Sequence, residues 1–157
     1  MLYIFFISGE IFHNLTTYNY IYMFDFNARE TTYVQFKIKG TAGANIGLFS
    51  DVKTTFNGES FYGFGLGSWS NSRATFFKSG HSTNLNTPNS LNSSVYLPYW
   101  ISWKDHILSL GTGNKVGQNV LLTHDDRATN PLVVNYLAFS SWGTLYNAFT
   151  YNNGKLY

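Results

Sequence analysis

Apolar residues recur at every second position along this chain, and that period of two restricts the fold more than any other feature of the sequence. Every second residue from 18 to 26 is aromatic, and Val34, Phe36 and Ile38 alternate with polar residues in the next segment. Successive side chains of a β-strand point to opposite faces, so each pattern predicts a strand with one buried face. No segment of about ten residues or more has the period of an amphipathic helix.

Further short runs have strand character, and each is bounded by Gly, Pro, Asn or Asp. They cover residues 45–49, 60–67, 73–78, 95–103, 107–110, 119–123, 132–140 and 146–151. About ten short strands at this spacing predict an all-β fold, namely an antiparallel β-sandwich that is jelly-roll-like. Residues 79–94 are polar and close to low complexity, and they are predicted to form a long surface loop.

The chain is predicted to hold one β-sandwich domain, residues 13–157, preceded by an apolar segment at residues 1–12. No charged or proline-rich linker divides the domain, whose length is close to the commonest size of a single domain. The apolar segment lacks the basic start and the apolar length of a signal peptide. It is predicted to add as an edge strand to its own sheet or to a second copy, which would give a homo-oligomer or filament. The side chains expected to carry this assembly are Leu2, Ile4, Phe5 and Phe6.

The composition is rich in aromatic residues, at 19%, and poor in charged residues, at 11%, whereas a typical globular domain has about 25% charged residues. The net charge is +2 and the basic residues are scattered singly, so no nucleic-acid partner is expected. The chain has no cysteine, which excludes disulfides, and no apolar stretch approaches the roughly 20 residues that span a bilayer. Its Asn, Ser and Thr content resembles that of secreted, glycan-facing proteins. An extracellular location is therefore expected, and the sequons at Asn14 and Asn92 permit it.

Three motifs resemble chemical sites, but each has a structural explanation. Residues 110–117 are glycine-rich, yet a strand follows them instead of the helix that a phosphate-binding loop needs, so a hairpin with positive-φ glycines is predicted. His124, Asp125 and Asp126 are adjacent, but calcium takes about six to eight oxygens, so a solvated turn is predicted there and no metal site. His106 is predicted to lie in a tight turn. No catalytic motif is present, so no catalytic residue and no cofactor are predicted.

The tryptophans are more informative. Alternation places Tyr99, Ile101 and Trp103 on one face of a strand, which is predicted to be a core face. Trp100 then lies on the opposite face. There it is either packed in a second layer, which is the favoured interpretation, or exposed as a platform on which a ligand can stack. Exposed aromatic rings beside amides are suited to sugars, because the ring takes the apolar face of a pyranose and the amide takes its hydroxyls. The candidate ligand-binding residues are Trp69, Asn71, Trp100 and Trp142.

Three blocks of sequence carry a resemblance to a known family. They are GSWSNSR at residues 67–73, YWISW at 99–103 running on to the glycines and VGQN of 111–119, and PLVVNYLAFS at 131–140. In order and spacing they resemble the farnesoic acid O-methyltransferase domain of animal proteins. The resemblance covers residues 18–151, which is nearly the whole chain.

Two residues depart from the family pattern: Ser68 stands where the family tends to have glycine, and His106 stands in a turn where glycine is usual. Both differences concern turn geometry. The resemblance implies a compact β-sandwich of the kind found in extracellular multidomain proteins beside lectin-like and adhesive modules. The family name implies methyl transfer.

The function predicted is a non-catalytic extracellular recognition or assembly module that binds a glycan or a protein partner through an aromatic surface. The alternative is a small O-methyltransferase acting on an isoprenoid carboxylic acid. Usual S-adenosylmethionine enzymes hold their cofactor at the edge of a parallel sheet flanked by helices, and this sequence predicts neither. The chain is therefore not expected to be an enzyme.

Overall fold

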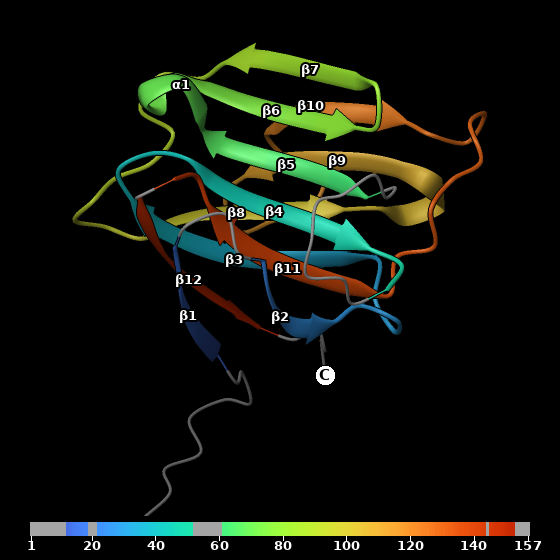
Figure 1. Ribbon diagram of the computed structural model, residues 1–157, viewed down its shortest axis with the longest axis horizontal. Coiled ribbons are helices and arrows are strands. Elements are labelled where there is room, and N and C mark those ends of the chain that lie inside the picture. The colour runs from blue at the N-terminus through green and yellow to red at the C-terminus, as the bar shows by residue number, and fades with distance from the viewer. Residues whose placement is uncertain (1–11, 19–21, 52–60, 144, 153–157) are drawn as a thin grey trace, which may run out of the picture.

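Two antiparallel β-sheets pack against each other in the computed structural model (Figure 1). The structure describes residues 12–18, 22–51, 61–143 and 145–152. The strand order of the first sheet is β1 (Phe12–Tyr18), β12 (Tyr146–Asn152), β3 (Tyr33–Gly40), β8 (Leu97–Ser102), β9 (Ile107–Thr112), β10 (Val120–Asp125). The order of the second is β2 (Met23–Asn27), β11 (Tyr136–Ser141), β4 (Ala44–Phe49), β5 (Tyr62–Gly67), β6 (Arg73–Lys78), β7 (His81–Asn86). The predicted all-β sandwich is confirmed.

Helical structure in the described residues is limited to the short turn α1 (Ser68–Asn71) and a 3-10 turn at Lys104–His106. The second of these contains Asp105 and His106 at φ values of 53° and 60°, so the predicted tight turn is confirmed. The glycine-rich segment after β9 is a hairpin in which Gly113 and Gly117 have φ values of 90° and 85°, also as predicted.

The predicted assembly segment lies almost entirely outside the described residues. Leu2, Ile4, Phe5 and Phe6 all belong to residues 1–11, and Phe12 is described only as the first residue of β1. The role of this segment in assembly stays a prediction.

The facing sides of the two sheets form the hydrophobic core. In β3, Val34, Phe36 and Ile38 are buried and alternate with residues that are partly or fully exposed, which confirms the predicted period of two. Burial of each such side chain stabilises the fold by about 1.5–3 kcal/mol before conformational entropy is subtracted. In the second sheet, Ile46 of β4 and Phe64 of β5 pack into the same core.

The prediction of one strand across residues 18–26 is wrong. β1 ends at Tyr18 and pairs with β12 in the first sheet, whereas β2 begins at Met23 and pairs with β11 in the second. The chain therefore changes sheets within the aromatic run. A period of two cannot reveal this change, because strands of both sheets alternate in the same way.

The prediction of a loop across residues 79–94 is wrong in its first half. Residues His81–Asn86 form β7, which pairs with β6 at the edge of the second sheet. All six residues of β7 are exposed, so this strand buries no apolar face that a sequence pattern could reveal.

The prediction of a solvated turn at residues 124–126 is wrong: His124 and Asp125 are the last two residues of β10, and the side chain of Asp126 is fully buried. The carboxylate accepts hydrogen bonds from Lys78 Nζ at 2.6 and 2.8 Å and from the hydroxyls of Tyr62 and Thr129. Burial alone would raise the pKa of Asp126, but the hydrogen bonds from Lys78, Thr129 and Tyr62 outweigh burial and lower the pKa to about 2. Asp126 thus joins the end of β10 in one sheet to β5 and β6 in the other.

Candidate ligand-binding groove

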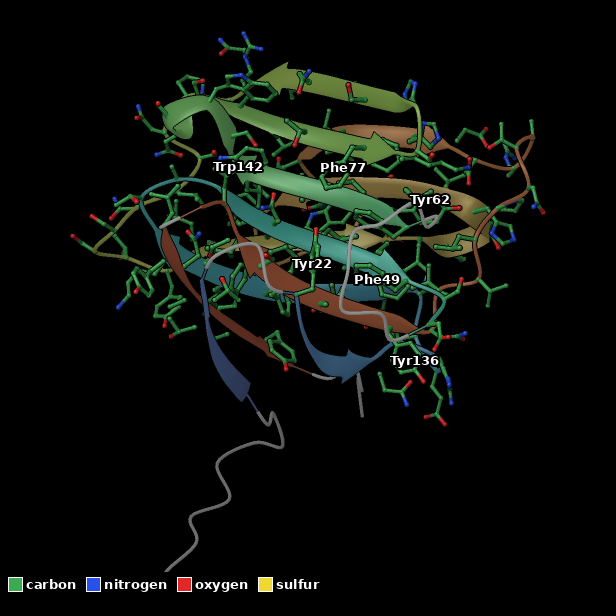
Figure 2. The ribbon with its side chains drawn as sticks, in the orientation of Figure 1. Tyr22, Phe49, Tyr62, Phe77, Tyr136 and Trp142 are labelled. Atoms are coloured by element: carbon green, nitrogen blue, oxygen red, sulfur yellow. The ribbon has the colours of Figure 1, made fainter. Side chains whose placement is uncertain are left out.

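A groove of about 780 Å³ lies on the outer face of the second sheet, the face turned toward the viewer in Figure 2. This volume is within the usual range of small-molecule sites. None of the described residues that line the groove is charged. We call it the aromatic groove, and the residues that define it are Tyr22, Asn45, Trp69, Thr75, Phe77 and Trp142.

Strand β5, which lies beneath the aromatic groove, carries glycine at every second position. Gly63, Gly65 and Gly67 alternate along β5, whose other residues face the core, so the outward side of this strand carries no side chain. The ring of Phe77 occupies the space over Gly63, its cross-strand partner, where a β-carbon would come within 2.0 Å of the ring. The ring of Phe49 covers Gly47 of β4 in the same manner.

Four aromatic rings form a cluster on this face of the sheet. Phe49 stacks on Phe61 at 5.0 Å between ring centroids, and Tyr22 and Phe77 meet this pair edge-on at 5.1 and 5.5 Å. In Figure 2, Phe49 lies toward the end of the sheet away from Trp142, with Tyr22 and Phe77 between them. Burial raises the pKa of the Tyr22 hydroxyl, which keeps this group neutral.

Trp69 is presented by an unusual turn directly after β5. Trp69, Ser70 and Asn71 have φ values of 46°, 55° and 62°, which is a left-handed conformation that costs about 1–2 kcal/mol per residue other than glycine. The Asn71 side chain holds the turn, because it donates to the Leu91 carbonyl at 2.8 Å and accepts from the Leu91 N–H at 2.9 Å. The Trp69 side chain stays 60% exposed, and the guanidinium of Arg73 lies 5.1 Å from its ring centroid.

Trp142 follows β11 and is 61% exposed. Its backbone N–H donates to the carbonyl of Gly43 at 2.8 Å, and the Gly43 N–H donates to the carbonyl of Gly67 at 3.0 Å. These two bonds connect the segment that carries Trp142 to the start of the turn that carries Trp69. The positions of the two exposed rings are therefore linked through the backbone of Gly43, which has a φ of 65°.

Polar side chains converge around the bare strand between these aromatic groups. Asn45 of β4 and Thr75 of β6 are the cross-strand partners of Gly65 on its two sides. A β-carbon at Gly65 would lie 2.3 Å from Thr75 Oγ1, 2.8 Å from Ser68 Oγ and 3.5 Å from Asn45 Oδ1. We call Asn45, Ser68 and Thr75 the polar cluster.

Two of the predicted ligand-binding residues meet in the aromatic groove, and two do not. Trp69 and Trp142 both line it. Asn71 does not line it and instead supports the turn behind Trp69. Sequence reasoning missed the polar cluster, although the alternating glycines of β5 are a signal that one face of this strand is bare.

The sequence left open whether Trp100 is buried or exposed, and the structure shows that it is buried. Its side chain is 1% exposed, Nε1 donates to the Gln118 carbonyl at 2.9 Å, and the ring covers Gly111. It cannot stack on a ligand in this position. Tyr99 and Ile101, on the other face of β8, are buried in the core as predicted.

Within the described ranges, no group of three or more His, Cys, Asp or Glu side chains is arranged to hold a metal ion. No helix in the described part of the chain is long and apolar enough to cross a membrane.

Three solved structures with a similar fold are a Crh5 transglycosylase in complex with NAG, a β-glucanase of Bacillus licheniformis, and a β-1,3-1,4-glucanase (lichenase) derived from a mouse hindgut metagenome. The transglycosylase is 12% identical with a TM-score of 0.54, over 90% of this chain and 73% of its own. The Bacillus enzyme is 10% identical with a TM-score of 0.51, over 85% and 69%. The lichenase is 8% identical with a TM-score of 0.51, over 79% and 66%. At these identities the similarity shows the sandwich fold alone.

A search of curated protein sequences found no significant match. The family model described as farnesoic acid O-methyl transferase matches residues 14–154, which is nearly the whole chain and includes every residue that defines the aromatic groove. The resemblance inferred from the three sequence blocks is therefore confirmed, and the chain belongs to the farnesoic acid O-methyl transferase domain family.

Proposed function

We propose that this domain is a non-catalytic, extracellular binding module that holds a glycan in the aromatic groove. The observation that carries the proposal is the pair of exposed tryptophans, Trp69 and Trp142, at a groove whose described lining residues are uncharged. An aromatic ring offers a large apolar surface to the C–H face of a pyranose, and neighbouring hydroxyl and amide groups bond to its hydroxyls. The similar folds named above are those of a transglycosylase in complex with NAG and of two glucanases, which supports this ligand class.

The absence of catalysis is part of the proposal, because glycoside hydrolysis canonically uses a pair of carboxylates beside the scissile bond. None of the described residues that line the aromatic groove is a carboxylate.

Methyl transfer, which the family name suggests, is the alternative. Calorimetry with S-adenosylmethionine separates the two: we expect no heat of binding at high micromolar concentration, and saturable binding would favour the methyltransferase.

The glycan proposal is tested by substitution of the two exposed tryptophans. A glycan array identifies ligands, and tryptophan fluorescence or calorimetry then measures their affinity for the wild type and for the variants Trp69→Ala and Trp142→Ala. Each variant should weaken binding at least about 10-fold, which corresponds to ~1.4 kcal/mol, because an aromatic anchor is removed. Tyr96→Ala is the control, since Tyr96 is an exposed aromatic residue that does not line the groove. Unchanged affinity in both tryptophan variants, or no binding to any glycan, would reject the proposal.

A further inference from the structure

We infer that the ligand of the aromatic groove is an uncharged sugar, and that one of its rings sits over the polar cluster, which covers Gly65, with its hydroxyls bonded to Asn45, Ser68 and Thr75. This inference rests on the proposed glycan-binding function and makes it more specific. It assigns Asn45, Ser68 and Thr75 as the residues that select the ligand, and Gly65 as the residue that leaves space for their polar atoms.

The strand register builds this subsite. Asn45, Gly65 and Thr75 are directly opposite one another across β4, β5 and β6. Their neighbours Ile46, Phe64 and Phe76 face the core, so the three residues face the groove. Ser68 approaches the same place from the start of α1. Three segments of backbone, β4, β6 and the start of α1, thus hold the polar atoms together over Gly65 of β5.

The polar cluster has hydrogen-bonding capacity that the described part of the protein does not use. No described group is hydrogen-bonded to the side chain of Asn45, Ser68 or Thr75. Thr75 is only 8% exposed, and its hydroxyl lies directly over Gly65. A ligand that supplies partners to these groups gains hydrogen bonds that the described part of the protein does not make. A sugar hydroxyl both donates and accepts, which matches an amide and two hydroxyls.

Acidic sugars are disfavoured because none of the described lining residues of the groove is charged. A carboxylate or sulfate that enters the groove loses water, and this loss is unfavourable unless a cation pairs with it. No described lining residue is a cation. The guanidinium of Arg73 lies over the ring of Trp69, and Arg73 is not among the lining residues. An uncharged sugar avoids this cost.

Gly65 is the residue that allows the polar cluster to lie directly against β5. A β-carbon there would lie 2.3 Å from Thr75 Oγ1 and 2.8 Å from Ser68 Oγ, closer than nonbonded atoms approach. Alanine at this position would therefore displace both hydroxyls from the places in which they bond to the sugar. The φ of Gly65 is not positive, so the substitution adds no left-handed strain to the strand.

The test compares two β-1,4-linked hexasaccharides, one of glucose and one of glucuronic acid, together with the N-acetylglucosamine hexamer as a second uncharged probe. Calorimetry at low salt measures their affinity for wild type, Thr75→Val and Gly65→Ala, with Thr123→Val as the control because Thr123 is an exposed threonine on the other sheet. We expect an uncharged hexamer to bind at least about 10-fold more tightly than the glucuronic acid hexamer. Thr75→Val, which keeps the shape and removes the hydroxyl, should weaken that binding at least about 10-fold, and Gly65→Ala should abolish it.

The outcomes separate this inference from the proposed function. If Trp69→Ala and Trp142→Ala weaken sugar binding while Thr75→Val and Gly65→Ala do not, the polar cluster is not the subsite and the inference is overturned, but the groove remains a glycan site. Equal or tighter binding of the glucuronic acid hexamer also overturns it. If no hexamer binds and an array finds no other glycan, the proposed function itself falls. Thermal melts of each variant confirm that it is folded.

Discussion

Two neighbouring aspartates show how strongly the environment decides the role of a residue. Asp125 is exposed and pairs with Arg127 at 2.5 Å, and the hydrogen bond from this guanidinium lowers the pKa of Asp125 to about 2. Asp126 has a similarly lowered pKa, but it is buried and bonded to Lys78. An exposed ion pair contributes little to stability, whereas a buried carboxylate depends on its partner.

We expect Asp126→Asn to lower the free energy of unfolding by about 3 kcal/mol, because it leaves the ammonium of Lys78 without its buried counter-charge. Urea unfolding followed by tryptophan fluorescence measures this change. The matched control is Asp125→Asn, which removes an exposed pair and should leave the unfolding midpoint unchanged. Equal effects of the two substitutions would contradict this account of Asp126.

At the residue scale, the sequence predicts the faces of strands better than their surroundings. Alternation correctly assigned Tyr99 and Ile101 to the core, and it placed Trp100 on the opposite face. Whether that face is covered depends on the Gln118 segment, which folds over the Trp100 ring. For Asp126, the partners Tyr62 and Lys78 come from strands far away in sequence, so no local pattern could indicate that it is buried.

At the scale of the elements, β7 depends on its turn more than on its own side chains. It is joined to β6 by the dipeptide Ser79 and Gly80, and Gly80 has a φ of 74°. All residues of β7 are exposed, so hydrophobic burial contributes little to its pairing. The turn and the backbone hydrogen bonds therefore hold this edge strand in place.

Gly80→Ala should destabilise the β6–β7 hairpin by about 1 kcal/mol, because a β-carbon is unfavourable at this positive φ. The space around Gly80 is open, so steric contact does not contribute. Hydrogen exchange should show faster exchange of the β7 amides in this variant, with β3 amides unaffected. Gly80→Asn is the control, since asparagine tolerates the left-handed region, and it should show a smaller effect. An equal loss in both variants would contradict the conformational explanation.

The aromatic run at residues 18–26 shows where element prediction fails. The alternation of that run is genuine, but β1 and β2 belong to different sheets. Strand assignment from sequence needs a break signal such as Gly or Pro, and the run contains neither. Conversely, Ser79 and Gly80 do form a turn signal, yet the polar residues after them hide the strand that follows.

At the scale of the whole molecule, the two sheets are joined by polar contacts as well as by the apolar core. Asp126 links the end of β10 to β5 and β6. Elsewhere, the hydroxyls of Thr17 on β1 and Ser141 on β11 lie 2.5 Å apart and are both buried. With no cysteine in the chain, packing and these contacts hold the sandwich together.

The contacts of Asp126 between the two sheets make the stability of the sandwich depend on pH. The pKa of Asp126 is about 2 in the folded state and near 4 in an unfolded chain, so its contribution is present above pH ~4 and is lost as the pH falls through about 2. We expect the difference in unfolding free energy between wild type and Asp126→Asn to be full at pH 7 and to shrink below pH ~4. Urea titrations at several pH values measure this difference in unfolding free energy. A difference that stays constant down to pH 2 would contradict the lowered pKa of Asp126.

The aromatic groove could be predicted only in part, because it is assembled by the register of the second sheet. The sequence identified Trp69 and Trp142 as exposed aromatic residues but gave no reason to place them together. Asn45 and Thr75 come into the same row as Gly65 through pairings between separate strands. The alternation within one strand shows which face a residue lies on, but it does not show which residue of another strand lies opposite it.

The rings of Phe49 and Phe77 rest directly on glycine backbone, at Gly47 and Gly63. A ring held this way has already given up most of its freedom to rotate when the chain folds. A ligand that settles on such a surface does not have to immobilise the rings a second time, so less entropy is lost on association. In the proposed function, the glycines therefore shift part of the entropic cost of ligand binding from the moment of association to the moment of folding.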